Sequence, residues 1–584
     1  MTATLIPNIS ARPDSHQAPP SRTPNDREGF RQAMSWLHTW AGLVLGWLLF
    51  AIFFTGTLSF FKNEFNLWMR PEMYGLPTAG AGVAQKSLDA LTRQSPGLTQ
   101  WIMHLPDERN PAVNILWRDT GNGRFETLHM NPQTGEAIQM RQTMAGDFFY
   151  RFHFELRTAQ KGRWALEGRW VVGVATMLML VALITGVITH RRIFKEFFTF
   201  RPAKGGQRAW LDAHNVSGVL VLPFYLMITL SGLMIFHSMY MPAGIATAYK
   251  NEKGVDSNAY FAELQGEKSS SRPRQGVNDK VEPLPSIALQ PILDAAIAHW
   301  EGGRIGSVQA RRDAQGHAVV EVTRHEGDRL QYRPLRLLFD ATTGQQLDHV
   351  NPTGPAAKTY GVLYGLHLAR FADTGMRWVL FGFGMLGSLM IATGMVLWSV
   401  KRSTRNQTSV HRKVATGGVA AKAPVGERLV AGMNITALAG LPLACGVYLA
   451  SNRLLPVDIE GRADTELAWF FCTWGMTLLW ALVCTVLRPN RMGWFVPLGA
   501  AALVWALLPV LNALTTQTHL GVTLPARAWV WVSMDLSFLV TGIVCGWLSW
   551  RLRPGRGLEG KARAKKPARA VAVQPSAQAS TSGA

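Results

Sequence analysis

Four histidines occupy matching positions in two halves of the segment 36–400. His38 is followed 17 residues later by Thr55-Gly56, and His214 is followed 17 residues later by Ser231-Gly232. His153 and His367 form a second matching set, because each lies between two apolar residues ahead of an Arg-Trp and a Thr-Gly dipeptide. Imidazole is a common metal ligand, and an ionisable side chain at membrane depth is a functional candidate.

The spacing of these motifs indicates an internal duplication. Arg169-Trp170 precedes Thr185-Gly186 by the same interval that separates Arg377-Trp378 from Thr393-Gly394. Two units in the same orientation imply a pseudo-two-fold axis along the membrane normal.

The loops between the paired apolar segments repeat as well. Residues 128–136 and 338–345 each predict a strand that runs into a turn with Thr-Gly. In the second loop, the pattern also predicts an amphipathic helix over 286–300 and strands over 318–323 and 330–339. Each loop is therefore predicted to form an external α+β module.

The predicted axis places His38 and His214 at one depth in the membrane, and His153 and His367 at another. Two imidazoles that face one another suit the two axial positions of a b-type haem, which needs no covalent attachment motif. Two such pairs, one per leaflet, predict two haems through which electrons cross the membrane. The alternative is that duplication copied structural histidines that bond to the backbone or to lipid phosphate.

His190 breaks the repeat, because Trp398 stands at the corresponding position of the second unit. It is predicted at about the depth of the first histidine pair, so it could replace one of those ligands or bond to a haem propionate. Arg191 and Arg192 beside it also suit propionates, although basic residues at the cytoplasmic end of a span commonly anchor it.

Eight apolar segments are long enough to cross a bilayer, whose apolar core needs about 20 helical residues. They run over residues 36–61, 170–190, 211–237, 377–400, 429–450, 467–487, 492–514 and 528–550. Only 17% of the 584 residues are charged and 48% are hydrophobic, whereas about 25% charged is usual in soluble proteins. The predicted fold class is a polytopic α-helical membrane protein with about eight transmembrane helices and two external α+β modules.

The net charge of +21 predicts the orientation of these spans. With the N-terminus in the cytoplasm, the external loops 62–168 and 238–376 are nearly neutral, and the whole basic excess falls on the cytoplasmic segments. Those segments are residues 1–35, 191–208, 401–428, 488–491 and 551–584. This is the positive-inside pattern, so both termini are predicted to be cytoplasmic. Nucleic acid is not needed to explain the charge.

The duplication also divides the chain into parts. A cytoplasmic tail (1–35) precedes the first repeat (36–190), a cytoplasmic loop (191–210) and the second repeat (211–400). A further cytoplasmic loop (401–428) leads to an appended four-span bundle (429–550) and a disordered basic tail (551–584). Asp535 is the only charged residue in the four appended apolar segments. All four cysteines lie there too, and none forms a covalent haem or zinc motif.

One sequence that matches a nucleotide-binding motif has another explanation. Residues 382–387 read G-x-G-x-x-G but lie inside an apolar span with no preceding strand, so they cannot hold a pyrophosphate. Small residues for close helix packing explain them better. Reduced nicotinamide or flavin would therefore have to act through a partner.

Motifs in four places together resemble a known family. They are His38 with Gly42, the basic and aromatic stretch 189–202, the sequence Trp-Leu-Asp-Ala-His-Asn at 210–215, and Tyr-Gly-Leu-His at 364–367. They look like the PepSY-associated transmembrane proteins, often described as iron-regulated membrane proteins, over about residues 30–402. The resemblance implies that the external loops are PepSY modules. It also implies similarity to di-haem ferric-siderophore reductases of the bacterial inner membrane.

On this resemblance, the chain would act in iron acquisition. Electrons from an unidentified cytoplasmic or membrane donor would enter near the histidines of the inner face, and a ferric siderophore would be reduced from Fe(III) to Fe(II) at the periplasmic face. Arginines near the outer histidines, Arg151, Arg157, Arg163 and Arg370, could hold haem propionates or an anionic chelate; the alternative is that they make ordinary contacts with lipid headgroups. Two other classes stay open: a PepSY-type regulatory or binding protein without a cofactor, and a transporter whose histidines relay protons.

Overall fold

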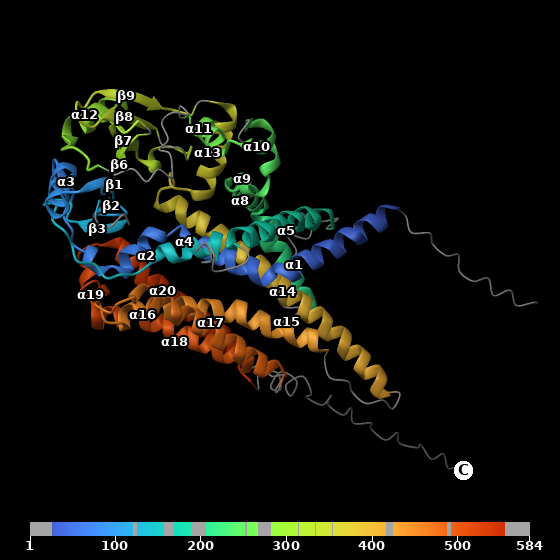
Figure 1. The fold of residues 1–584 in the computed structure, drawn as a ribbon. Helices are drawn as coiled ribbons and strands as arrows, with labels where there is room; N and C mark the ends of the chain where they lie inside the picture. Colours follow the sequence, from blue (N-terminus) through green and yellow to red (C-terminus); the bar gives the residue numbers. More distant parts are fainter. Residues whose placement is uncertain are drawn as a thin grey trace, which may run out of the picture.

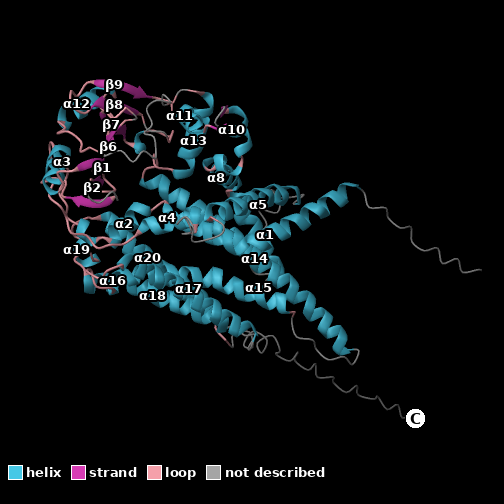
Figure 2. Cartoon of the chain, in the orientation of Figure 1, coloured by secondary structure: helices cyan, strands magenta, loops and turns pink. Residues whose placement is uncertain are grey.

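The fold consists of long apolar helices with a β-sheet module at one end (Figure 1). The computed structural model describes residues 26–120, 125–156, 167–189, 206–251, 254–266, 282–313, 315–332, 335–352, 354–415, 424–486 and 492–554. Figure 2 shows that the strands gather at that single end of the helices. We call the end of the helices beside the sheet the sheet side and the opposite end the tail side.

Seven helical segments are long and apolar enough to cross a membrane, among the residues that the structure describes. They are α1 (Asp26–Ser59), α5 (Gly168–Thr189), α14 (Thr374–Ala415), α15 (Val425–Ile435) continued through a π-helical turn (Thr436–Gly440) into α16 (Leu441–Leu454), α17 (Arg462–Val486), α18 (Met492–Thr515) and α20 (Trp529–Arg551). The chain is thus a multi-pass helical membrane protein, as predicted.

The predicted span 211–237 is not one straight helix. It consists of α7 (Gly206–Leu220) and α8 (Leu222–Ile235), which meet at an angle of 68°. Pro223 stands in the first turn of α8, and a proline there lacks the N–H that a continuous helix would need. The Tyr225 hydroxyl donates to the Ser217 carbonyl across the bend, at 2.9 Å. The two helices together are still long and apolar enough for one bent span.

Two neighbouring modules form one seven-stranded antiparallel sheet in the order β3-β2-β1-β6-β7-β8-β9. The first module contributes β1 (Leu98–His104), β2 (Val113–Asp119) and β3 (Glu126–Met130), and the second contributes β6 (Ile305–Arg312), β7 (Ala318–Arg324), β8 (Arg336–Asp340) and β9 (Gln346–Val350). The modules join where β1 pairs with β6, so the strand order is mirrored about that pair. Helices α3 (Val83–Gln94) and α12 (Leu289–His299) share one hydrophobic core with the strands.

The predicted turns of the two modules have the same local structure. Gly135 and Gly344 adopt positive φ angles of 73° and 71°, which glycine tolerates at no steric cost. Asn131 and Asp340 each accept backbone hydrogen bonds from the two residues that precede the glycine. The predicted strand over 330–339 is shorter than expected, because β8 begins at Arg336.

Shorter elements connect the spans to the sheet. They are α2 (Lys62–Met69), η1 (Pro71–Met73), α4 (Gly146–Glu155), α9 (His237–Tyr240), α10 (Pro242–Ala248), β4 (Lys250–Asn251), β5 (Gly254–Val255), α11 (Ser257–Gln265), η4 (Glu326–Asp328), α13 (Pro355–Leu368) and α19 (Leu520–Thr523). Of these, α4 and α13 are the predicted membrane-edge helices that carry a histidine.

The glycine-rich stretch of α14 packs tightly on α1. A Cβ at Gly384 would lie 2.3 Å from the Thr57 hydroxyl oxygen, and one at Gly387 would lie 2.3 Å from the Phe53 ring. Both distances are too short for real atoms, so glycine permits this close approach of the two helices. The interpretation of the G-x-G-x-x-G sequence as a packing motif is confirmed.

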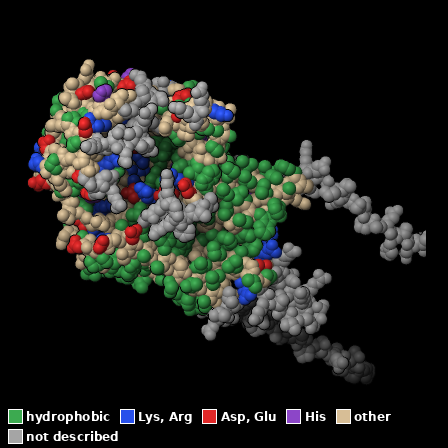
Figure 3. All heavy atoms as spheres, viewed as in Figure 1, with side chains coloured by type: hydrophobic (Ala, Val, Ile, Leu, Met, Phe, Trp, Pro, Cys, Tyr) green, Lys and Arg blue, Asp and Glu red, His purple; other side chains and the backbone are tan. Residues whose placement is uncertain are grey.

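The surface of the helices agrees with a membrane setting. Figure 3 shows hydrophobic side chains covering the helical part, while charged side chains gather on and around the sheet module. Such a wide apolar surface would be unfavourable in water.

Candidate functional site

The structure brings the four repeated histidines together in two pairs. The ring centroids of His38 on α1 and His214 on α7 lie 6.2 Å apart, and those of His153 on α4 and His367 on α13 lie 6.1 Å apart. We call these the tail-side pair and the sheet-side pair. Along α1, the 14 residues from His38 to Ile52, which contacts the sheet-side pair, span about 21 Å.

Three of the four rings are held through Nδ1 by a backbone carbonyl of a neighbouring helix. The distances are 2.8 Å from His38 to Ala182, from His153 to Ile52 and from His214 to Met390. Nδ1 must carry the hydrogen to donate to a carbonyl, so Nε2 keeps the lone pair that can bind a metal. A metal-binding histidine typically has this outer hydrogen bond, which fixes its tautomer and orientation.

His367 is held in a related way. Its Nδ1 lies 2.9 Å from the Ser231 hydroxyl, and its ring is also hydrogen-bonded to the backbone of Ile228. In each of the four cases the backbone partner lies four residues before the glycine of a Thr-Gly or Ser-Gly dipeptide. The dipeptides are Thr55-Gly56, Thr185-Gly186, Ser231-Gly232 and Thr393-Gly394.

The glycine of each dipeptide makes room for the histidine ring. A Cβ at Gly56 would lie 2.5 Å from the His153 ring, and a Cβ at Gly186, Gly232 or Gly394 would lie 3.0–3.1 Å from the ring of its own histidine. The hydroxyl before each glycine bonds to carbonyls of its own helix. The repeated dipeptide is therefore a cradle, in which a bare helix backbone receives an imidazole and orients it.

The pair separation suits a metal ion between two rings. With metal–nitrogen bonds of about 2.0–2.1 Å on each side and the half-width of each ring added, the two ring centroids of an axial pair lie about 6 Å apart. In the part of the chain that the structure describes, no group of three or more His, Cys, Asp or Glu side chains is placed to hold a metal ion. Each pair therefore offers two nitrogen ligands, which is the number of axial positions on a haem.

Comparison with known proteins assigns the part of the chain that contains both pairs. Residues 35–401 match the family described as the PepSY-associated TM region. The chain belongs to the PepSY-associated transmembrane family. A relative, the uncharacterized protein PA4219 of Pseudomonas aeruginosa, is 23% identical over 392 residues, which cover 62% of this chain and 90% of the relative. The family match ends before α15, so the four appended spans lie outside it.

Within the family region, one cavity adjoins the sheet-side pair. Its lining includes both histidines, Gly56, Gly384 and Tyr150. Tyr150 lies one turn before His153 and interacts with Arg370, which follows His367 by three residues. A tyrosine and an arginine thus lie close to the pair in sequence and interact with each other.

Further charged groups lie near Arg370. Arg370 forms an ion pair with Glu326, and Lys62 forms one with Asp147 at 3.0 Å. Burial, and then the positive charges of Arg370 and Lys62, lower the pKa of His104 at the end of β1. In Figure 3, Lys and Arg side chains gather in a hollow between the sheet module and the helices.

An ion cluster that the sequence did not reveal joins the first module to α14. Glu64 on α2 accepts from Arg109 at 2.8 and 3.0 Å and from Arg377 at 2.5 Å. Burial alone would raise the pKa of Glu64, but the hydrogen bond and charge of Arg109, with the charge of Arg377, hold its pKa below the usual range. The three residues are far apart in sequence, so no local motif marked them.

Other residues singled out from the sequence lie elsewhere. His190, Arg191, Arg192, Arg157 and Arg163 lie outside the described residues. Arg151 is exposed and faces Glu155 at 3.6 Å. A further histidine, His237 at the start of α9, bonds to the Met234 carbonyl and the Tyr260 hydroxyl and belongs to neither pair.

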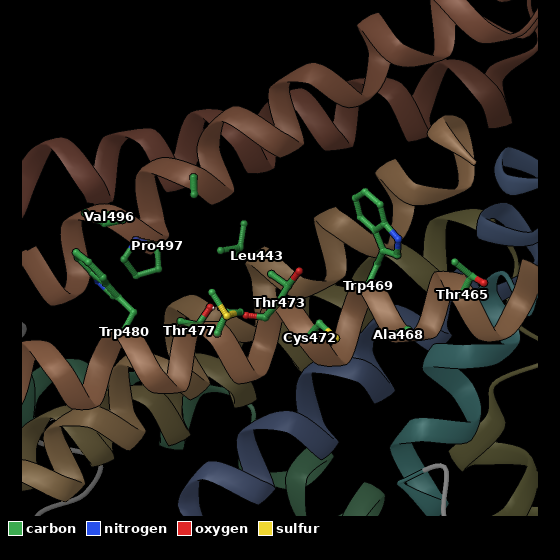
Figure 4. Close-up of a pocket in the computed structure, with 12 residues that line it drawn as sticks. Leu443, Thr465, Ala468, Trp469, Cys472, Thr473, Thr477, Trp480, Val496 and Pro497 are labelled. Carbon is green, nitrogen blue, oxygen red and sulfur yellow. Dashed lines mark hydrogen bonds between the residues drawn. The ribbon is translucent and has the colours of Figure 1, made fainter. Parts of the chain in front are cut away.

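A larger cavity lies away from the histidines. It has a volume of about 620 Å³ and is lined by side chains of α16, α17 and α18 in the appended bundle. Figure 4 shows Trp469, Cys472, Thr473 and Trp480 of α17 along this groove, with Val496 and Pro497 of α18 opposite. Its walls are almost entirely apolar, and none of the residues that line it is charged.

Proposed function

We propose that this protein is a haem-containing reductase of the bacterial inner membrane, which passes electrons across the bilayer and reduces ferric siderophore at the periplasmic face. The observation that supports it best is the double pair of histidines, each ring oriented by a Thr-Gly or Ser-Gly cradle. A structural histidine needs no partner imidazole, whereas an axial ligand pair does.

The donor set fits a haem at each pair. The chain supplies two imidazole nitrogens, and a porphyrin supplies the four equatorial ones, so a six-coordinate iron is complete. When bound, haem supplies one-electron transfer, and the protein supplies position and electrostatics. The carbonyl bonds to Nδ1 of His38, His153 and His214 make these imidazoles more basic and fix their orientation.

The residues near the sheet-side pair support an exit for electrons toward the sheet. Tyr150 lines the histidine cavity and interacts with Arg370, which is ion-paired with Glu326. Arg370 and Lys62 provide positive charge for haem propionates or an anionic chelate. A siderophore holds Fe(III) through hard oxygen donors, and uptake of one electron gives Fe(II), which those donors hold less tightly.

The absorption spectrum of the purified protein tests this proposal. We expect a Soret band and reducible α and β bands, with about two haems per chain. The variants His38→Ala and His367→Ala should each remove about half of the haem. His317→Ala is the matched control, because His317 is an exposed side chain on the sheet and should leave the haem content unchanged.

A second measurement separates the reductase from the other classes. In vesicles loaded with a reductant, the wild-type protein should reduce an external ferric chelate, and His367→Ala should abolish this transfer. A colourless, folded protein produced with ample haem would exclude the proposal and favour a cofactor-free binding protein. Substrate uptake that needs no reductant would instead indicate a transporter.

A further inference from the structure

The appended bundle contacts the first repeat at the corner where α4 begins, and α4 carries His153. Ala145 at this corner has a φ of 46°, which is unusual for a residue other than glycine. Such a conformation costs about 1–3 kcal/mol and persists only where the surroundings hold it. The next residue, Gly146, lies so close to the Lys62 carbonyl that a Cβ there would be 2.1 Å from its oxygen.

Two residues of the bundle, Tyr448 and Glu466, hold this corner. The Tyr448 hydroxyl on α16 donates to the Ala145 carbonyl at 3.1 Å. The Thr143 hydroxyl accepts from the Ala145 N–H at 3.0 Å and donates to the Glu466 carboxylate on α17. Thr143, Tyr448 and Glu466 are all buried. Both polar groups of the strained residue therefore depend on the bundle, one directly and one through Thr143.

Glu466 is in turn held by one residue of its own helix, α17, and by one residue of the neighbouring helix α16. Arg462 forms an ion pair with it, and the Asn452 side-chain amide donates to it at 2.8 Å. A carboxylate that is buried with a cation and further hydrogen-bond donors is held in one geometry. The acceptor of the Thr143 hydroxyl is thus rigid.

A second contact fixes α2, the helix that faces α4. Arg453 lies over the Trp68 ring at 3.9 Å and donates to the Trp68 carbonyl. The Trp68 indole N–H donates to Asp535 on α20 at 2.9 Å. Asp535 is the one charged residue that the apolar appended segments contain, and one of its hydrogen-bond donors lies in the first repeat.

Aromatic side chains of α4 also pack against aromatic side chains of the bundle. The ring centroids of Phe148 and Tyr448 lie 4.8 Å apart, as do those of Phe148 and Phe470, and Phe152 lies 5.8 Å from Phe470. The equivalent helix α13 in the second repeat buries small residues instead, Ala357, Gly361 and Gly365. Its N-cap residue Gly354 has an ordinary φ of −62°. Among the described residues, the histidine helix of the second repeat thus begins without such a strained corner.

We propose that the appended bundle is a positioning domain for the sheet-side histidine pair: Tyr448 and Glu466 hold the Ala145 corner, and the corner sets the direction of α4 and the place of His153. The part of this proposal that concerns haem binding rests on the proposed function, and the positioning of α4 does not. The tail-side pair, on α1 and α7, has no such connection to Tyr448 or Glu466 among the contacts of the described residues.

The test uses full-length Thr143→Val, which keeps the shape of the side chain but removes the hydroxyl, and Thr143→Ser, which restores it. Tyr448→Phe removes the other contact with a smaller change. Ser549→Ala is the control, because the Ser549 hydroxyl donates to the Phe495 carbonyl inside the bundle, at 3.0 Å. We expect amide hydrogen exchange in residues 146–155 to rise at least tenfold in Thr143→Val and in Tyr448→Phe, with no rise in α7.

The haem spectrum gives the second readout. Thr143→Val should lower the haem content toward one per chain and remove the spectral component that His367→Ala removes, and Thr143→Ser should restore it. Unchanged exchange in residues 146–155 in both Thr143→Val and Tyr448→Phe would overturn the positioning role. If the wild-type protein binds no haem, the proposed function fails, while the exchange experiment still decides whether the bundle positions α4.

Discussion

At the residue scale, the glycines of the four cradles decide whether an imidazole can lie against a helix backbone. Gly56→Ala would place a methyl group 2.5 Å from the His153 ring, so the ring must leave the Ile52 carbonyl. We expect the haem content of this variant to fall toward one per chain. Haem extraction with pyridine, set against protein concentration, measures the change.

Gly42→Ala is the matched control for that experiment. Gly42 lies on the same helix, but a Cβ there would meet nothing within 4 Å. Alanine also favours a helix over glycine by about 1 kcal/mol, so neither substitution should weaken α1 by itself. A loss of haem in Gly42→Ala equal to that in Gly56→Ala would contradict the cradle.

A second residue-scale prediction concerns His129 in the sheet. Burial, and then the charge of Arg70, lower its pKa to about 4, and its Nδ1 bonds to the Asn114 side chain. The unfolded chain has a histidine pKa of about 6.5, so it binds more protons than the folded chain between pH 4 and 6.5. Stability should therefore fall as the pH drops through this window.

Thermal unfolding followed from pH 7 to 4.5 checks this dependence. In His129→Gln the loss of stability over that range should be smaller than in the wild type. Equal slopes in the two proteins would show that His129 is not the group responsible.

Only some of the residues of the candidate site could be predicted from the sequence. The four histidines and their glycine dipeptides could be predicted because duplication repeats them at equal spacing. The carbonyls of Ala182, Ile52 and Met390 could not, because a backbone acceptor leaves no signature in the side-chain sequence. Glu64, Arg109 and Arg377 were missed since they meet only after folding.

At the element scale, hydropathy located the spans but not their shape. The run 211–237 is apolar enough to be predicted as a span, yet Pro223 divides it into α7 and α8. The first repeat has no proline at the matching position, and α1 continues for 34 residues. The helix ends beyond the apolar segments were also underestimated, and for that reason the buried Arg453, Arg462 and Glu466 were not foreseen.

The bend itself makes a testable prediction. Tyr225 is fully buried, and its hydroxyl bonds to the Ser217 carbonyl across the break. Tyr225→Phe removes this bond and should destabilise the protein by about 1 kcal/mol, as loss of a buried hydrogen bond commonly does. A lower melting temperature in detergent would show it. Tyr249→Phe, which alters an exposed tyrosine bonded to Glu263, should melt like the wild type.

At the scale of the whole molecule, the two repeats contact each other both in the sheet and among the membrane-spanning helices. On the sheet side, β1 pairs with β6, so the two modules share one sheet. Within the helices, each histidine pair takes one ring from each repeat. The duplication predicted that the units are related by an axis, but only the structure shows that their strands join.

The orientation of the whole molecule decides which histidine pair faces which compartment. The basic excess lies on the tail-side segments, so the positive-inside rule predicts a cytoplasmic tail side and a periplasmic sheet. Cysteines introduced at two exposed positions, Gln345→Cys in the sheet and Ser403→Cys at the tail end of α14, can report this. In intact spheroplasts, a membrane-impermeant maleimide should label the first variant above the wild-type level and leave the second unlabelled until the membrane is opened. The reverse pattern would place the sheet-side pair in the cytoplasm, and the periplasmic reduction of a ferric chelate would then be impossible at that pair.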